Sequence, residues 1–149
     1  MRSIDLRSVL LARHAQHVVV VHFPIALFLV GTLFDVAACR WERAELEHAA
    51  HLNLLAAAVS APFVVATGIA AWRWQLGGQR LHGTLLYHLA LGCLSGALIC
   101  LVAGVRQRSR RKGVGTPLVL IVLELAAAAL VTVTAHLGGI VSGVNLPSM

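Results

Sequence analysis

Eight histidines are the residues of this 149-residue chain whose type and spacing could support chemistry. His22, His88 and His136 fall inside three different apolar stretches, while His17 and His82 stand beside such stretches. A neutral imidazole can ligate haem iron or a metal ion, and it can pass protons near neutral pH. The spacing therefore predicts a layer of imidazoles at a similar depth in several helices.

A bis-histidine haem b is one chemistry that this layer could serve. Such a haem needs two neutral imidazoles from different helices at one depth. We predict His22 and His88 as the axial ligands, with His136 as a substitute ligand or a neighbour of one. Arg73 and Arg80 lie in the polar stretch before His88 and could pair with the haem propionates. The cofactor prediction is accordingly one haem b.

Three other interpretations of the histidines stay open. A copper or zinc site needs three or four imidazoles close together. A proton relay would use the histidines together with Asp35 and Glu124. In the third interpretation the imidazoles bind no ligand and only hydrogen-bond carbonyl and hydroxyl oxygens near the helix ends. The candidate metal ligands are His17, His22, His82, His88 and His136.

Two acidic residues lie within apolar stretches. Asp35 is close to the end of the first stretch, and Glu124 is about seven residues into the fourth, roughly 10 Å deep at 1.5 Å per residue. A carboxyl group at such a depth is either protonated or paired. These two buried acids therefore indicate either a hydrogen bond between helices or a path for protons or cations.

The composition identifies the environment of these groups. Hydrophobic residues make up 58% of the chain and charged residues 12%, with a mean hydropathy of +0.83. A soluble domain is about 45–50% apolar and about 25% charged, and a chain of this length cannot bury so much apolar surface in water. The composition excludes a soluble globular enzyme, a disordered chain and a disulfide scaffold.

Four apolar stretches are long enough to cross a bilayer, which takes about 20 helical residues. We predict spans at about 18–38, 49–72, 83–105 and 117–137, joined by short polar loops. The expected fold is all-α, an integral membrane four-helix bundle in a single domain over residues 1–149. The letters of the sequence show no convincing internal repeat.

Charge sets the expected orientation. The third loop, 106–112, carries five basic residues, which the positive-inside rule places in the cytoplasm. With four spans, both termini are then outside, and the basic residues divide seven inside to five outside. The net charge of +6 is explained by contact with the membrane surface, so no nucleic-acid partner is expected.

Helix packing could also be the main role of the chain. Gly92 and Gly96 form a GxxxG motif, whose small residues let another helix approach closely. A ligand-free structural or assembly protein could dock a membrane partner, or a second copy of itself, through this face. The chain contains no nucleophile elbow, phosphate-binding glycine loop or HExxH motif, so it is not expected to be an enzyme by itself.

Several motifs resemble one bacterial family of four-span membrane proteins, the domain-of-unknown-function 2231 family. They are the block from His17 to Leu27, which contains HFPIAL, then Asp35, Thr67-Gly68, His88, and the stretch from Ala135 to Gly139. His136 stands where that family often has tryptophan. The resemblance implies a protein of the bacterial cytoplasmic membrane. Relatives fused to Rieske or cytochrome c domains imply a small redox-associated subunit with a redox protein or membrane subunit as partner.

Overall fold

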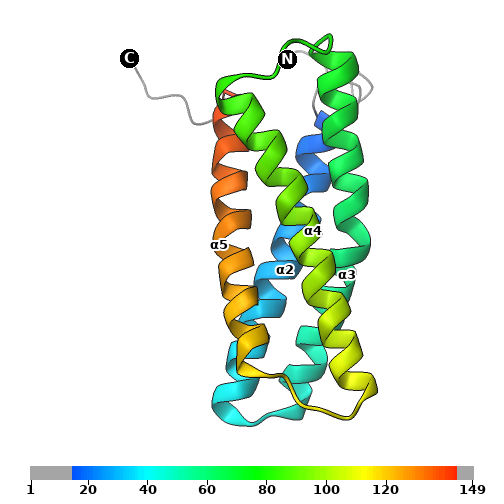
Figure 1. Ribbon diagram of the computed structural model, residues 1–149, viewed down its shortest axis with the longest axis vertical. Helices are drawn as coiled ribbons and strands as arrows, with labels where there is room; N and C mark the ends of the chain where they lie inside the picture. The colour runs from blue at the N-terminus through cyan, green and yellow to red at the C-terminus, as the bar shows by residue number, and fades with distance from the viewer. Residues whose placement is uncertain (1–14, 144–149) are drawn as a thin grey trace, which may run out of the picture.

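The computed structural model describes residues 15–143, which form four long helices packed side by side (Figure 1). The helices are α2 (Ala15–Trp41), α3 (Ala44–Ala70), α4 (Gly83–Arg111) and α5 (Leu118–Val141). All four are long and apolar enough to cross a membrane. At 1.5 Å per residue they measure about 36 to 44 Å, more than the roughly 30 Å of hydrocarbon in a bilayer. The prediction of an all-α membrane bundle is confirmed.

The chain runs up and down as two antiparallel hairpins, α2–α3 and α4–α5. Between the hairpins, α3 packs on α4 and α2 packs less closely on α5, so that α2 and α4 lie across the bundle from each other. The loops that close the two hairpins lie together at one end of the bundle, below in Figure 1, which we call the loop end. The connection between α3 and α4 crosses the opposite end, which we call the crossover end.

The helix ends differ from the predicted spans at one place that matters for the site. We predicted that the third span ends at 105 and that Arg106 begins the third loop, but α4 continues to Arg111. Arg106 is a helical residue with 1% of its surface exposed. Arg108, Arg110 and Arg111 are helical too, but they lie at the end of α4, and only Arg106 is buried and drops out of the basic residues that meet the membrane surface. The excess that favoured a cytoplasmic loop falls to six against five, and the orientation stays a prediction.

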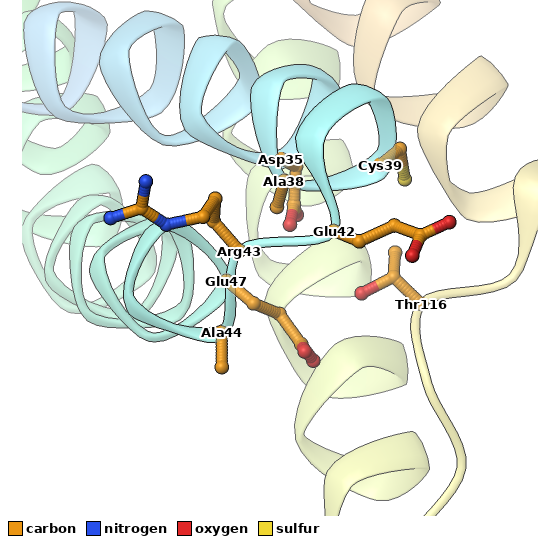
Figure 2. Close-up of a pocket in the computed structure, with 8 residues that line it drawn as sticks. All are labelled: Asp35, Ala38, Cys39, Glu42, Arg43, Ala44, Glu47 and Thr116. Carbon is orange, nitrogen blue, oxygen red and sulfur yellow. The ribbon is translucent and has the colours of Figure 1, made fainter.

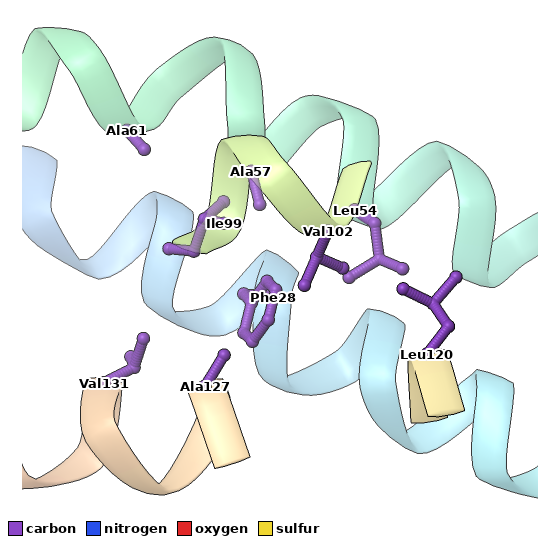
Figure 3. Packing of buried hydrophobic residues seen from close by; sticks show 9 residues of the cluster. All are labelled: Phe28, Leu54, Ala57, Ala61, Ile99, Val102, Leu120, Ala127 and Val131. Atoms are coloured by element: carbon purple, nitrogen blue, oxygen red, sulfur yellow. The ribbon is translucent and has the colours of Figure 1, made fainter. Parts of the chain in front are cut away.

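The interior of the bundle is narrow and filled mainly by small and medium apolar side chains (Figure 3). Large apolar side chains such as Phe23, Leu33 and Phe63 point outward instead, each about two thirds exposed. Such an inverted distribution suits helices whose outer surface meets lipid. The buried cluster consists of Phe28, Leu54, Ala57, Ala61, Ile99, Val102, Leu120, Ala127 and Val131.

Candidate functional site: a buried charge cluster

Three charged side chains from three helices meet inside the bundle towards the loop end. They are Asp35 of α2, Arg106 of α4 and Glu124 of α5, which we call the charge cluster. Asp35 and Glu124 have no exposed surface, and Arg106 has 1%. Each of the three groups lies on the buried face of its helix. On α4, for example, Arg106 follows the buried residues Ser95, Ile99 and Val102 at spacings of three and four residues. The packing of the helices therefore forces these groups together.

The guanidinium of Arg106 is the centre of the cluster. Its Nη1 donates to Oδ2 of Asp35 and to the hydroxyl of Thr116, the latter at 3.1 Å. Its Nη2 donates to the backbone carbonyl of Glu47 at 3.1 Å. Oε1 of Glu124 is 3.9 Å from Nη1, close enough for attraction but too far for a hydrogen bond. Arg106 therefore pairs with Asp35 and only approaches Glu124.

Several buried polar atoms of the cluster lack a hydrogen-bond partner among residues 15–143. They are Oδ1 of Asp35, Nε of Arg106 and both carboxyl oxygens of Glu124, and the hydroxyl of Thr32 on α2 is in the same condition. A buried polar atom without a partner costs about 1–3 kcal/mol, and more when it is charged. The hydrogen bonds of the cluster are thus incomplete, and its unpaired carboxyl oxygens outnumber its unpaired donors.

The charges of the cluster do not balance. Asp35 and Glu124 are neighbouring acids that share one guanidinium, which leaves one net negative charge if both are ionised. An uncompensated charge buried in a protein is costly, so the neutral arrangement is favoured. One proton on either carboxyl group restores neutrality and supplies a donor where the acceptors are in excess.

A pocket of about 240 Å³ opens beside the cluster at the loop end (Figure 2). Asp35 is one of its lining residues, and the pocket opens towards the hairpin loops. The side chains of Glu42 and Glu47 lie on the same side of the pocket as Thr116 and are acidic. The pocket therefore connects the buried pair to the end of the bundle. The remaining lining residues are Ala38, Cys39, Arg43 and Ala44.

Two histidines are held at the crossover end, each within its own hairpin. Nδ1 of His17 lies 3.0 Å from the hydroxyl of Thr67, and its ring packs on Gly68 of α3. Nδ1 of His88 lies 3.1 Å from the carbonyl of Thr134, and its ring packs on Gly138 of α5. A Cβ at either glycine would come within about 3.1 Å of the ring, so these glycines make room for the imidazoles. Both contacts are tight packing between the two helices of one hairpin.

The remaining predicted haem and metal residues lie on the outside. His22 is exposed and bonds the carbonyl of Val18 on its own helix through Nδ1, at 2.6 Å. His82 and His136 are exposed, as are Arg73 and Arg80, the predicted partners of the propionates. Within residues 15–143 no three His, Cys, Asp or Glu side chains gather closely enough to hold a metal ion. The haem and metal sites gain no support from this arrangement and stay predictions.

The sequence profile of one family, described as "Predicted membrane protein (DUF2231)", matches residues 13–144. The chain belongs to this family. The resemblance found in the HFPIAL block and the motifs after it is thereby confirmed. No curated protein and no solved structure matches the chain. Membership in the DUF2231 family establishes an integral membrane protein, and the description names no activity.

The GxxxG motif of this DUF2231 protein faces its own bundle. A Cβ on Gly96 would lie 3.0 Å from Cγ2 of Val65 on α3, and one on Gly92 would lie 3.9 Å from Cγ2 of Thr134 on α5. Gly96 therefore lets α4 approach α3 closely, whereas the contact at Gly92 is an ordinary one that would also accept a Cβ. The docking of another protein through the GxxxG face stays a prediction.

Arg106 is the residue of the charge cluster that the sequence of this DUF2231 chain did not reveal, because a basic residue after an apolar stretch is expected in the loop. A signal was present in the spacing. Asp35 follows His17 by about five helical turns, and Arg106 follows His88 by the same interval. Because this interval is a whole number of turns, the two members of each pair share one face of their helix. The face that carries an inward histidine therefore also carries an inward charged group.

Proposed function

We propose that this membrane protein binds and releases a proton at the charge cluster, with the proton held by the carboxyl groups of Glu124 and Asp35. The observation that carries the proposal is that Glu124 is fully buried with neither oxygen hydrogen-bonded, next to a second acid whose Oδ1 also lacks a donor. A proton is the smallest species that supplies the missing donor and cancels the excess charge. Arg106 fixes Asp35 as the ionised partner, which leaves Glu124 as the group that gains and loses the proton.

The pocket supports exchange with water on the side of the hairpin loops. Asp35 borders both the pocket and Arg106, so a proton that enters through the pocket meets Asp35 before Glu124. Glu42 and Glu47 place two carboxyl groups at the lining, beside the guanidinium of Arg43, and Glu47 pairs with Arg110 at 3.6 Å. The hydroxyl of Thr116 is both a lining group and a hydrogen-bond partner of Arg106. Exchange at the loop end is therefore the route that the lining residues favour.

Infrared difference spectroscopy on the protein in lipid vesicles tests this proposal. We expect a pH step to change a carbonyl stretch that belongs to a protonated carboxyl group in an apolar site. The band should be absent in Glu124→Gln, whose amide keeps the size of the side chain and can donate to Asp35. Glu47→Gln is the matched control, because Glu47 lines the pocket without contributing its carboxylate to the pairing of Arg106.

Each result of this experiment has a definite meaning. A band lost in Glu124→Gln and kept in Glu47→Gln supports proton binding at Glu124. A carbonyl band that persists in Glu124→Gln, or no titrating carboxyl group over the whole pH range in which the protein stays folded, overturns the proposal. Retained thermal unfolding of Glu124→Gln in detergent shows that a lost band is not a loss of fold.

The redox-associated haem b subunit is the alternative proposal, and the layer of histidines predicted from the sequence is what favours it. It requires that the ring of His22 turn away from its exposed position and that His88 exchange the carbonyl of Thr134 for iron. A dithionite-minus-oxidised spectrum of protein purified from haem-replete cells tests it. Soret and α bands at one haem per chain, lost in His22→Ala, would support it, whereas a flat spectrum would refute it.

A further inference from the structure

The buried positions of α2 and α4 coincide when the two helices are aligned without gaps so that Asp35 falls on Arg106. The buried residues of α4 are Ser95, Ile99, Val102, Ala103 and Arg106. The residues aligned with them are Pro24, Phe28, Gly31, Thr32 and Asp35, and these five are the buried residues of α2 between positions 17 and 41. The alignment that superimposes the two members of the ion pair thus also superimposes the other four buried positions of the two helices.

The second helices of the two hairpins coincide in the same way when Ala57 is aligned with Ala127. Ala50, Leu54, Ala57, Ala61 and Val64, the buried residues within α3, correspond to Leu120, Glu124, Ala127, Val131 and Thr134, which are buried in α5. The sixth buried residue of α5, Ile121, aligns with the half-buried His51 and is the one exception. Leu55-Ala56-Ala57-Ala58 then aligns with the identical Leu125-Ala126-Ala127-Ala128. A shared heptad-like spacing alone could align buried positions of any two helices. The identical LAAA segment goes beyond that spacing.

The packing of the histidines repeats as well, and spacing alone does not explain it. The alignment of α2 with α4 places His17 on His88, and the alignment of α3 with α5 places Gly68 on Gly138. In the first hairpin the ring of His17 lies on Gly68, and in the second the ring of His88 lies on Gly138. An uncommon contact between two helices therefore occurs twice, at equivalent positions.

We infer that the chain is built from two copies of one helical hairpin, related by an approximate two-fold axis along the bundle, and that the charge cluster is a site between the copies. The apolar core has the same symmetry, since Phe28 and Ile99, Ala57 and Ala127, and Ala61 and Val131 are equivalent pairs (Figure 3). Many transporters built from repeats, parallel ones included, place their substrate and ion sites where the repeats meet. Here the pair of Asp35 and Arg106 spans that interface.

Glu124, the third charged residue of the cluster, makes the two copies different at the interface. Glu124 belongs to the same copy as Arg106, and its equivalent in the first copy is the apolar Leu54. Arg106 can therefore pair across the interface with Asp35 or within its own copy with Glu124. This step rests on the proposed function: a neutral Glu124 leaves Arg106 bound to the other copy, and an ionised Glu124 competes for it. Proton exchange would thus change how firmly the two copies are connected at the loop end.

Other charged groups around Arg106 have to be considered in any pH dependence. On α2 these are Asp35 and the thiol of Cys39, and on α5 the group is Glu124. On α3 the groups are Glu47 and His51, and on α4 Arg110 lies 3.6 Å from the carboxylate of Glu47. Glu47 is thus already engaged by Arg110. The competition at Arg106 is between Asp35 and Glu124.

Exchange of the equivalent residues tests the repeat. Asp35→Arg combined with Arg106→Asp reverses the ion pair, and adding Leu54→Glu with Glu124→Leu produces the two-fold image of the native cluster. We expect either single charge change to lose most of the folded yield in detergent. The double variant should recover part of it, and the quadruple variant should come within about twofold of the parent. A quadruple variant no better than the double one overturns the equivalence of these positions.

Cross-linking provides a second test, which does not depend on the folding of charge variants. Sγ of Cys100 on α4 lies 3.6 Å from the carbonyl of Ala58 on α3. The equivalent residues are Leu29 on α2 and Ala128 on α5. With Cys39 and Cys93 replaced by serine, Ala58→Cys should oxidise with Cys100. In a chain that also lacks Cys100, Leu29→Cys with Ala128→Cys should oxidise too, and Leu29→Cys with Ala129→Cys should not. Cross-linking of the first pair alone would refute the repeated packing.

The dependence on protonation is read from the same cysteine pair. If Glu124 controls the interface, the cross-linking rate of the cysteines at 29 and 128 should change with pH by more than the ionisation of the thiols accounts for. Glu124→Gln should remove this additional pH dependence. A pH-independent rate, together with a titrating carbonyl band of Glu124, refutes this coupling and leaves the proposed function standing. Absence of both the band and the pH dependence refutes the proposed function itself, while the two cross-links still decide the repeat.

Discussion

The two ends of the bundle hold their polar groups in opposite ways. At the crossover end, each inward histidine is bonded within its own hairpin and seated on a glycine, so the contact is complete. At the loop end, Asp35 and Arg106 join different hairpins, and buried atoms of Asp35, Arg106 and Glu124 remain without partners. A satisfied contact stabilises a fold, whereas an incompletely satisfied one can gain a ligand. The loop end is therefore where we place the function.

The largest expected effect comes from removing the cation at the loop end. Arg106→Leu leaves Asp35 buried without its partner, which should lower the free energy of unfolding by about 3–5 kcal/mol. Thermal or detergent-induced unfolding of the purified protein measures this loss. Arg108→Leu is the matched control, because Arg108 is exposed on the same helix and its side chain forms no hydrogen bond or ion pair within the described residues.

A triple variant shows whether the cluster is kept for stability. Replacing Asp35, Arg106 and Glu124 together by leucine should recover most of the loss, because a buried ion pair exchanged for apolar residues is often neutral. A triple variant that unfolds as easily as Arg106→Leu would mean that the cluster is needed for the fold itself. The contrast between the two ends would then disappear.

At the crossover end, adding a single methyl group should have a moderate effect. A Cβ at position 138 would lie 2.9 Å from Cε1 of His88, whose ring is held by the carbonyl of Thr134. We expect Gly138→Ala to cost about 1–3 kcal/mol, the usual range for overpacking. The control is Gly104→Ala, since a Cβ there meets no described atom within 4 Å. If His88→Ala added to Gly138→Ala brings no recovery, the clash is not with the imidazole.

The four spans and the buried acids could be predicted from the sequence because hydropathy and the cost of burying charge depend on residue type alone. The sequence did not show which side of each helix faces the interior of the bundle. His17 and His22 are separated by about 140° around the helix, so only one of them can face the interior. We chose His22 as the haem ligand, yet His17 is the one that faces α3.

The role of Arg106 and the repeat were both missed for a related reason. The rule that counts basic residues in loops treats an arginine after an apolar stretch as solvated, and only the neighbouring helices show that Arg106 is buried. The two hairpins have few identical residues outside the LAAA segment, since lipid-facing positions accept any apolar residue. The buried positions and the contacts between histidine and glycine carry the similarity.

A smaller effect is expected for the hydroxyl of Thr134 at the crossover end. Its Oγ1 lies 3.2 Å from the hydroxyl of Ser95 and donates to the carbonyl of Leu130 at 2.8 Å. Thr134→Val should cost about 1 kcal/mol, the net value of a typical hydrogen bond. Thr132→Val is the control, because the exposed hydroxyl of Thr132 only bonds its own helix. Equal losses in the two variants would mean that the contact between Ser95 and Thr134 contributes nothing.

The smallest effect is expected for His22. Its imidazole is exposed and bonds only the carbonyl of Val18 among the described residues, so His22→Ala should change the free energy of unfolding by no more than about 0.5 kcal/mol. His88→Ala should cost clearly more, because the ring fills the space above Gly138. Unfolding curves of the two variants, recorded on protein from haem-replete cells, provide the measurement. If His22→Ala destabilises as much as His88→Ala and also removes a Soret band, the two imidazoles act together, and the crossover end carries the function instead.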